Sequence, residues 1–164
     1  LKERLRKFNL ELEESKSRMI EFGKYAEINS KRKYGRKAET FNFLGFTLYC
    51  GKSRHSGAFC VKLKTNSKKF TQKLKQTKEW LYQNNDLPVK DLITRLNKKL
   101  VGHYRYYGVS HNINKLSAFL HYVQRYLFKV LNRRSHKKSY TWDGYIDMLK
   151  VYPLAKPKIY VKLF

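Results

Sequence analysis

The spacing of the apolar residues changes near Ser67, from every second residue to about every 3.6 residues. Before that point, AFCVKLKT (58–65) alternates apolar and polar side chains, and TFNFLGFTLYC (40–50) is rich in aromatic and β-branched residues. Because GKSRHSG (51–57) between them has the composition of a turn, we predict a β-hairpin over residues 40–65. The change of period therefore predicts an α+β chain, with strands first and helices afterwards.

Four amphipathic segments follow, and each is bounded by residues that typically begin or end helices. Gly108 is expected to end the second helix, and Asp143 or Thr141 is expected to cap the fourth. We predict helices over about 67–83, from Pro88 to Tyr107, from Asn112 or Asn114 to about Arg134, and from Ser139–Asp143 to before Pro153.

Upstream of the hairpin, the spacing of apolar residues gives a weaker signal for secondary structure. It predicts a short basic helix at the start, a strand over residues 18–22, and a loop over the polar, basic residues 28–37. The chain starts at Leu1 inside a helix-like run and without Met, which indicates a fragment of a longer protein. We therefore divide the chain into a β-containing part over 1–65, a helical domain over 66–150, and a tail or linker over 151–164.

The chain is strongly basic, with 37 Lys and Arg against 12 Asp and Glu and a net charge of +25. With 41% hydrophobic residues it can still bury a core, so it is not a disordered basic tail. Residues 1–64 hold 16 basic and 7 acidic residues, and residues 65–164 hold 21 and 5. The helical part is thus the more electropositive, which favours RNA or DNA as its partner. An acidic membrane is the weaker candidate partner, because no amphipathic segment is both strongly basic and free of tertiary partners, and a membrane partner is therefore not expected. No stretch is long and apolar enough to span a bilayer.

The basic residues of the second predicted helix lie on a face of their own. At about 100° per residue, Leu92, Leu96 and Leu100 share one stripe, whereas Arg95 and Lys98 project from the opposite side. One side of this helix is therefore predicted to pack against the core, and the other to meet phosphates.

The stretch GHYRYYG (102–108) ends the second helix and divides between its two faces. His103 and Tyr107 project toward the core, Tyr104 lies at the edge of the apolar stripe, and Tyr106 joins the basic face. We therefore predict that Tyr106 is the tyrosine of this stretch that contacts nucleic acid.

The third helix carries tyrosines among its cations. Cations can bind phosphates while the rings stack on bases or pack on sugars. The alternative is that Tyr122 and Tyr126 pack against a neighbouring domain and the charges are simply solvated. The predicted nucleic-acid-binding residues are Lys69, Lys73, Arg95, Lys98, Lys99, Arg105, Tyr106, Tyr122, Arg125, Tyr126, Lys129, Arg133, Arg134, Lys137 and Lys138.

The sequence shows no pattern that would support catalysis. There is no carboxylate pair in a strand context, no phosphate-binding glycine loop, and no Cys/His or Ser/His arrangement. Cys50, His55 and Cys60 lack a fourth ligand and the short cysteine spacing of a zinc site, so no metal site is predicted. The residues alone therefore predict a chain that binds and positions.

The chain contains, in this order, LKERLRKFNLELEESKSRMIEFG (1–23), TFNFLGFTL (40–48), LNKKLVGHYRYYG (96–108) and LNRRSHKKSYTWDGY (131–145). Together these segments resemble the C-terminal half of group II intron reverse transcriptases, also called maturases. The first is similar to the palm segment after the catalytic aspartates, and the second is similar to the primer-grip block. The helices from Ser67 onward resemble the thumb, or domain X, most specifically in the last two segments. Ser17 stands where the family more commonly has Thr.

The resemblance implies a parent RNA-directed DNA polymerase that uses Mg²⁺, assists splicing of its intron and supports retrohoming. The catalytic aspartates would precede Leu1, so this chain is expected to be inactive alone and to bind no cofactor itself. Lys16 would approach the incoming triphosphate. The implied partners are the group II intron RNA, the template–primer duplex, and the remaining palm and fingers. The implied primer-grip residues are Phe43, Leu44, Gly45 and Phe46.

The expected location is the bacterial cytoplasm, in a ribonucleoprotein associated with the nucleoid. Two alternatives stay open. One is the thumb of a diversity-generating or CRISPR-associated reverse transcriptase. The other is an RNA-binding module with no enzyme attached, although a purely helical RNA-binding module would not need the FLGF hairpin.

Overall fold

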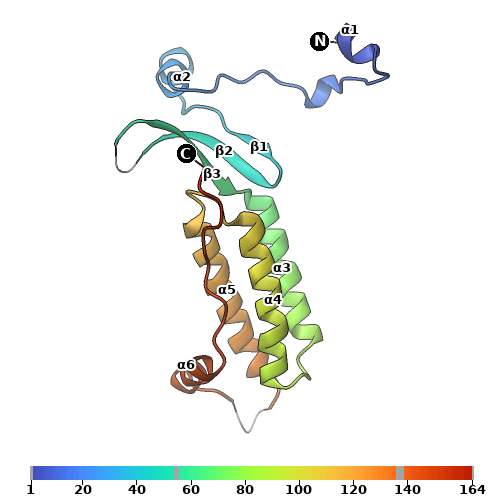
Figure 1. Ribbon diagram of the computed structural model, residues 1–164, viewed down its shortest axis with the longest axis vertical. Helices are drawn as coiled ribbons and strands as arrows, with labels where there is room; N and C mark the ends of the chain where they lie inside the picture. The colour runs from blue at the N-terminus through green and yellow to red at the C-terminus, as the bar shows by residue number, and fades with distance from the viewer. Residues whose placement is uncertain (1, 54–55, 136–138, 164) are drawn as a thin grey trace. The chain divides into compact units, whose positions relative to one another are not determined.

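The computed structural model describes residues 2–53, 56–135 and 139–163, and divides the chain into two compact units. We call residues 1–40 with 49–61 the N-terminal unit, and residues 41–48 with 62–164 the helical unit. Sheet and helices follow one another as predicted for an α+β chain (Figure 1). The elements are α1 (Lys2–Arg6), η1 (Glu14–Lys16), α2 (Ala26–Tyr34), β1 (Phe41–Phe43), β2 (Phe46–Lys52), β3 (Phe59–Thr65), α3 (Ser67–Gln83), α4 (Val89–Tyr107), α5 (Ile113–Leu131) and α6 (Trp142–Val151).

The sheet has three antiparallel strands in the order β1-β2-β3, and the predicted hairpin corresponds to β2 and β3. A tight turn splits off β1, which pairs with β2 so that Phe43 lies opposite Phe46. Both turn residues, Leu44 and Gly45, have positive φ angles of 46° and 79°. Such a two-residue turn matches the twist of the strands it joins, and it favours glycine because β-carbons are strained there.

Two predictions for the N-terminal unit are wrong. The predicted loop over 28–37 is mostly the helix α2, which buries only Ala26 and Ser30 and ends at Gly35 with φ 63°. The helix was missed because so few apolar residues repeat with the helical period in this polar segment. Residues 18–22, predicted to form a strand, are not in a strand. A strand needs a hydrogen-bonded neighbouring strand, which the local spacing of apolar residues does not reveal.

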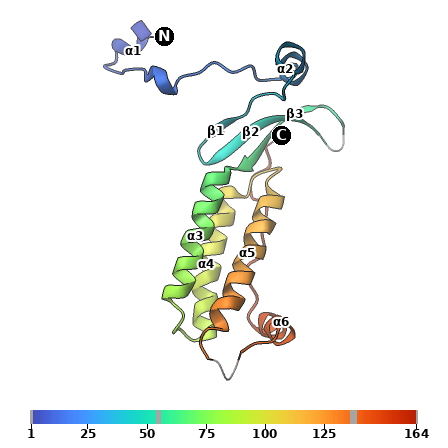
Figure 2. The same cartoon turned by 180° about the vertical axis from the view of Figure 1, so that it is seen from behind.

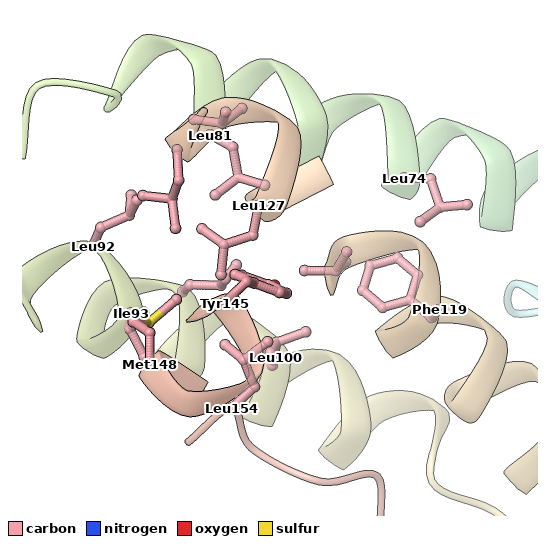
Figure 3. Close-up of a cluster of buried hydrophobic side chains, with 14 of the residues drawn as sticks. Leu74, Leu81, Leu92, Ile93, Leu100, Phe119, Leu127, Tyr145, Met148 and Leu154 are labelled. Carbon is pink, nitrogen blue, oxygen red and sulfur yellow. The ribbon is translucent and has the colours of Figure 1, made fainter. Parts of the chain in front are cut away.

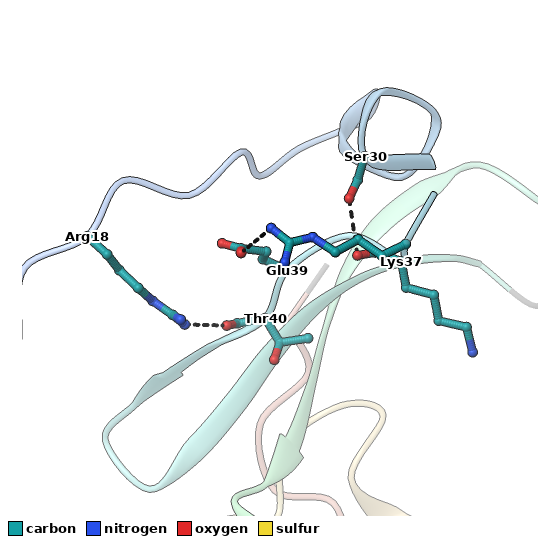
Figure 4. A network of polar contacts seen from close by, with 6 residues as sticks. Arg18, Ser30, Lys37, Glu39 and Thr40 are labelled. Atoms are coloured by element: carbon teal, nitrogen blue, oxygen red, sulfur yellow. Dashed lines mark hydrogen bonds and ion pairs between the residues drawn. The ribbon is translucent and has the colours of Figure 1, made fainter. Parts of the chain in front are cut away.

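Polar contacts connect the segments of this unit (Figure 4). The Arg18 guanidinium donates to the Thr40 carbonyl at 3.0 Å, and the Ser30 hydroxyl donates to the Lys37 carbonyl at 3.2 Å. Arg36 pairs with Glu39 at 3.2 Å. Exposed ion pairs of this kind each contribute little stability.

All four predicted helices are present with nearly the predicted bounds. Asn66 begins α3, where its side chain accepts from the amides of Lys68 and Lys69. Thr141 caps α6 by accepting from the Gly144 amide at 3.2 Å, which decides between Thr141 and Asp143. Pro88 precedes α4 instead of lying in its first turn.

The helices α3, α4 and α5 run side by side, and α6 lies at the end of this bundle that is remote from the start of α3 (Figures 1 and 2). Apolar side chains from all four helices meet in one core, with the Tyr145 ring among the leucines (Figure 3). The Tyr145 hydroxyl donates to the Gln124 carbonyl at 2.9 Å, so its polar end is satisfied. Tyr104, predicted to lie at the edge of the apolar stripe, is fully buried here.

The tail after α6 packs against the helices of its own unit. The side chain of Asn97 donates to the Pro153 carbonyl and accepts from the Ala155 amide, at 2.9 and 2.7 Å. Further along, the Gly108 carbonyl accepts from the amides of Tyr160 and Val161. A β-carbon on Gly108 would lie 2.6 Å from the Lys158 carbonyl, so this position needs glycine for the approach of the tail.

Candidate nucleic-acid interface

The turn between β1 and β2 is bound to the C-terminal end of α4 within the helical unit. The Tyr106 hydroxyl donates to the Leu44 carbonyl at 3.0 Å, and the Phe46 ring stacks with Tyr106 at 6.1 Å between centroids. Phe46 also meets Tyr107 edge-on at 5.3 Å, and a β-carbon on Gly45 would lie 3.0 Å from the Tyr107 hydroxyl. Two tyrosines of GHYRYYG therefore position the turn.

The side chains of Phe43 and Leu44 at this turn are exposed to solvent. They are 61% and 66% exposed, whereas Phe46 is half-buried. Sequence reasoning assigned Tyr106 to nucleic acid and missed its contact with Leu44, because a contact between residues 62 positions apart leaves no periodic signal. Tyr106 is still 55% exposed, so its contact with nucleic acid stays a prediction.

Asn112 fixes the end of β3 onto the helices. Its side chain is fully buried, accepts from the Thr65 amide at 2.8 Å, and donates to the Thr65 hydroxyl and the Tyr107 carbonyl at 2.9 and 2.8 Å. A buried amide with its donors and acceptor paired rigidifies the structure around it. Asn112 therefore holds the strand and the end of α4 in one arrangement.

Most of the predicted cations lie exposed on the helices. Among the described residues, none of those on α4 and α5 forms an ion pair with a carboxylate. Two of the five acids of the helical unit, Glu79 and Asp147, are paired with Lys75 and Lys150 instead. Unneutralised cations on a surface raise its positive potential, which suits a polyanion. The exposed predicted cations are Lys69, Lys73, Arg95, Lys98, Lys99, Arg105, Arg125, Lys129 and Arg133.

Contacts between cations and aromatic rings join α3 to both of its neighbouring helices. Toward α4, the Lys99 ammonium lies 4.8 Å from the centre of the Trp80 ring. Toward α5, Lys78 lies over both Tyr82 and Tyr126, at 5.9 and 5.8 Å. Sequence reasoning did not include Lys78, Trp80 or Tyr82, although the spacing of Lys78 and Tyr82 by one helical turn was a usable signal.

The two tyrosines of the third helix lie against α3. Tyr122 meets Phe70 edge-on at 6.4 Å and stays 42% exposed, while Tyr126 is partly buried against the core beneath Lys78. Each ring thus has a partner within the chain, as the alternative interpretation allowed. The exposed part of Tyr122 remains accessible to a ligand.

The arginines at the end of α5 stabilise the bundle as well as adding charge. Arg133 lies 5.2 Å from the centre of the Tyr82 ring. Arg134 donates from Nε to the side chain of Asn85 at 3.1 Å, and burial lowers the pKa of its guanidinium. Arg134 therefore attaches the end of α5 to the loop after α3. The predicted residues Lys137 and Lys138 lie outside the described residues.

The remaining predicted positions lie in the N-terminal unit. Lys16 is the last residue of η1, and its role stays a prediction. Cys50 and Cys60 are free, half-buried thiols. Within 2–53, 56–135 and 139–163, no group of three or more His, Cys, Asp or Glu side chains could hold a metal ion. Nor is any helix in these ranges long and apolar enough to cross a membrane.

These features define the helical unit as a basic helical domain whose exposed surface suits a polyanion. Residues 67–145 match the family model described as "Group II intron, maturase-specific domain". The matched segment is slightly less than half of the chain, and the match is consistent with the C-terminal part of a group II intron maturase, as the resemblance implied. The match supports a maturase role in splicing and suggests binding of group II intron RNA. No curated protein and no solved structure matches the chain.

Proposed function

We propose that this chain is the RNA- and primer-gripping part of a group II intron reverse transcriptase, and that its helical unit binds intron RNA to promote splicing. One observation carries the proposal: the maturase-specific match over residues 67–145 coincides with the exposed cations of α3, α4 and α5. Phosphate contacts made by such cations tolerate many RNA sequences, and they position an RNA by its backbone.

We assign the turn between β1 and β2 to the primer grip of the parent polymerase. In support, Tyr106 and Tyr107 contact the turn, and the backbone N–H of Asn66 donates to the Gly45 carbonyl at 2.9 Å. A rigid turn with exposed Phe43 and Leu44 side chains can place a strand end reproducibly. The catalytic aspartates and their Mg²⁺ ions would belong to another part of that protein.

We further propose that the N-terminal unit packs against the remaining palm of the polymerase. Met19 is 99% exposed, and Phe8, Leu10 and Ile28 are 69%, 55% and 64% exposed. Large apolar side chains gathered in one unit favour burial against a partner surface. The backbone contacts of Arg18 and Ser30 would keep this unit in shape for that contact.

The test of RNA binding is the triple charge reversal Arg95→Glu, Lys99→Glu and Arg125→Glu. These side chains are exposed and form no ion pair with the described residues, so the fold should be unchanged. We expect the affinity for a group II intron RNA, measured by filter binding, to fall roughly 100-fold at moderate salt.

The matched control reverses three exposed cations of the N-terminal unit, Lys31, Arg32 and Lys37, and so changes the net charge equally. We expect it to weaken binding far less, because its cations lie outside the maturase-specific segment. Equal losses for the two triple variants would mean that net charge, and not this surface, determines the affinity.

A further inference from the structure

A cavity of about 110 Å³ lies between α3 and α4 of the helical unit. Its exposed rim includes Lys73, Gln76 and Lys99, and its floor includes the buried residues His103 and Phe119. One water needs only about 10 to 15 Å³ of such space, so a group of several atoms fits. Apolar side chains form part of the lining, and two of them, Leu100 and Phe119, belong to the buried cluster drawn in Figure 3.

His103 is the unusual residue of this floor. It is only 5% exposed, its ring stacks on Phe119 with centroids 4.0 Å apart, and neither ring nitrogen has a hydrogen-bond partner among the described residues. Thr77 on the same wall donates its hydroxyl hydrogen to the Lys73 carbonyl at 2.8 Å, so this hydrogen is not available to His103. An unpaired buried polar group is costly, so a ring that lines a cavity without a partner in the chain favours binding of a polar group there.

The hydrogen-bonding groups and charges that line the cavity indicate which class of ligand fits it. Burial, aided by the positive charge of Lys73, lowers the pKa of His103 to about 4, so the ring is neutral near pH 7. A neutral imidazole offers one donor and one acceptor, which matches the mixed donor and acceptor edge of a nucleobase. A phosphate has only acceptors near neutral pH and suits the lysines of the rim instead.

We propose that this cavity takes up one unpaired nucleotide of the bound RNA, with the edge of its base at His103 and its phosphate at Lys73 and Lys99. The proposal rests on the RNA binding proposed above and adds a preference to it. RNA duplexes conceal their base edges, whereas an unpaired nucleotide can leave the stack and enter a pocket. The rim ring of Trp80, already under Lys99, lies beside the path of the base.

The test compares two short RNA hairpins that differ by one unpaired nucleotide, using the full chain. Because only the bulged hairpin offers a base that can enter the cavity, we expect it to bind about tenfold more tightly. The variant His103→Phe fills the site with an apolar ring, so this preference should disappear while binding to the paired hairpin and its salt dependence remain. The matched control His121→Phe, on the exposed side of α5, should keep the preference.

A second measurement does not depend on any variant. The imidazole nitrogen NMR signals of His103 should shift when the bulged hairpin is added and stay unchanged with the paired one. Equal affinities of the wild type for both hairpins, or an unchanged preference in His103→Phe, would mean that the cavity holds only water or takes another class of ligand. If neither hairpin bound in a salt-dependent way, the proposed RNA binding itself would be wrong.

Discussion

The two units of the chain differ in what stabilises them. The helical unit buries a cluster of 16 apolar residues, whereas in the described part of the N-terminal unit the buried residues are Ala26 and Ser30. Burial of apolar surface is the main favourable contribution to folding, so the helical unit has its own source of stability. The N-terminal unit, with Met19 almost fully exposed, has little of it. The binding surface proposed on α3–α5 therefore lies on a well-packed core, which would keep its cations in place.

The largest effect should come from a charge placed in the core of the helical unit. Leu96 is fully buried, so Leu96→Asp removes its packing and buries a carboxylate without a partner. We expect a loss of at least about 4 kcal/mol and the loss of helical circular dichroism. Lys98→Asp on the exposed face of the same helix is the control. Comparable melting of Leu96→Asp and wild type would show that the described core does not hold the fold.

The next effect should come from the link between β3 and the bundle. Asn112→Ala leaves the Thr65 amide and the Tyr107 carbonyl without their partner in a buried site. Each unsatisfied buried group costs roughly 1 to 3 kcal/mol, so we expect about 3 kcal/mol in urea unfolding. Asn114→Ala, at an exposed position of the same helix, should cost less than about 0.5 kcal/mol. Similar losses for both would contradict the role given to Asn112.

A pH-dependent loss of stability should be confined to the helical unit and traceable to His103. Its folded pKa of about 4 lies below the ordinary value of 6.5, so the unfolded chain binds the proton first as the pH falls. The neutral His103 ring therefore leaves the free energy of unfolding at its full value above about pH 6.5. As the pH falls toward 4, protonation of the unfolded chain lowers this free energy by up to about 3 kcal/mol. Urea unfolding at pH 7 and pH 4.5 should therefore show a smaller decrease for His103→Phe than for the wild type. Identical decreases would contradict the burial of a neutral ring.

The smallest effect is expected in the N-terminal unit. Because Met19 is 99% exposed, Met19→Ser should change the free energy of unfolding by less than about 0.5 kcal/mol. The matched change Met148→Ser, at a buried position of α6, should cost several times more. A large loss for Met19→Ser would show that this unit buries apolar surface after all.

The accuracy of the sequence predictions follows the same division. The helices of the helical unit were predictable because Leu92, Leu96 and Leu100 repeat with the helical period and face one core. The helix α2 was missed because Ala26 and Ser30 give almost no apolar stripe. Local pattern also placed nine of the predicted cations on exposed faces, whereas Arg134 is half-buried.

Contacts between distant segments were beyond the sequence pattern. The pattern placed Tyr106 on the basic face, but its bond to Leu44 depends on how the turn and α4 meet. The use of Arg134 to bind Asn85 and the cavity at His103 likewise arise only when separate helices pack. Periodicity reports which face of a helix is buried and says nothing of its partner.

The most direct test of the central claim is the salt dependence of RNA binding by the full chain. If α3–α5 hold the RNA by its phosphates, each contact displaces a counterion from the RNA. We therefore predict that the affinity for a group II intron RNA falls by about a thousandfold between about 50 and 200 mM salt, and that the triple reversal of Arg95, Lys99 and Arg125 shows a shallower slope. An affinity that stays flat across this range would contradict the account.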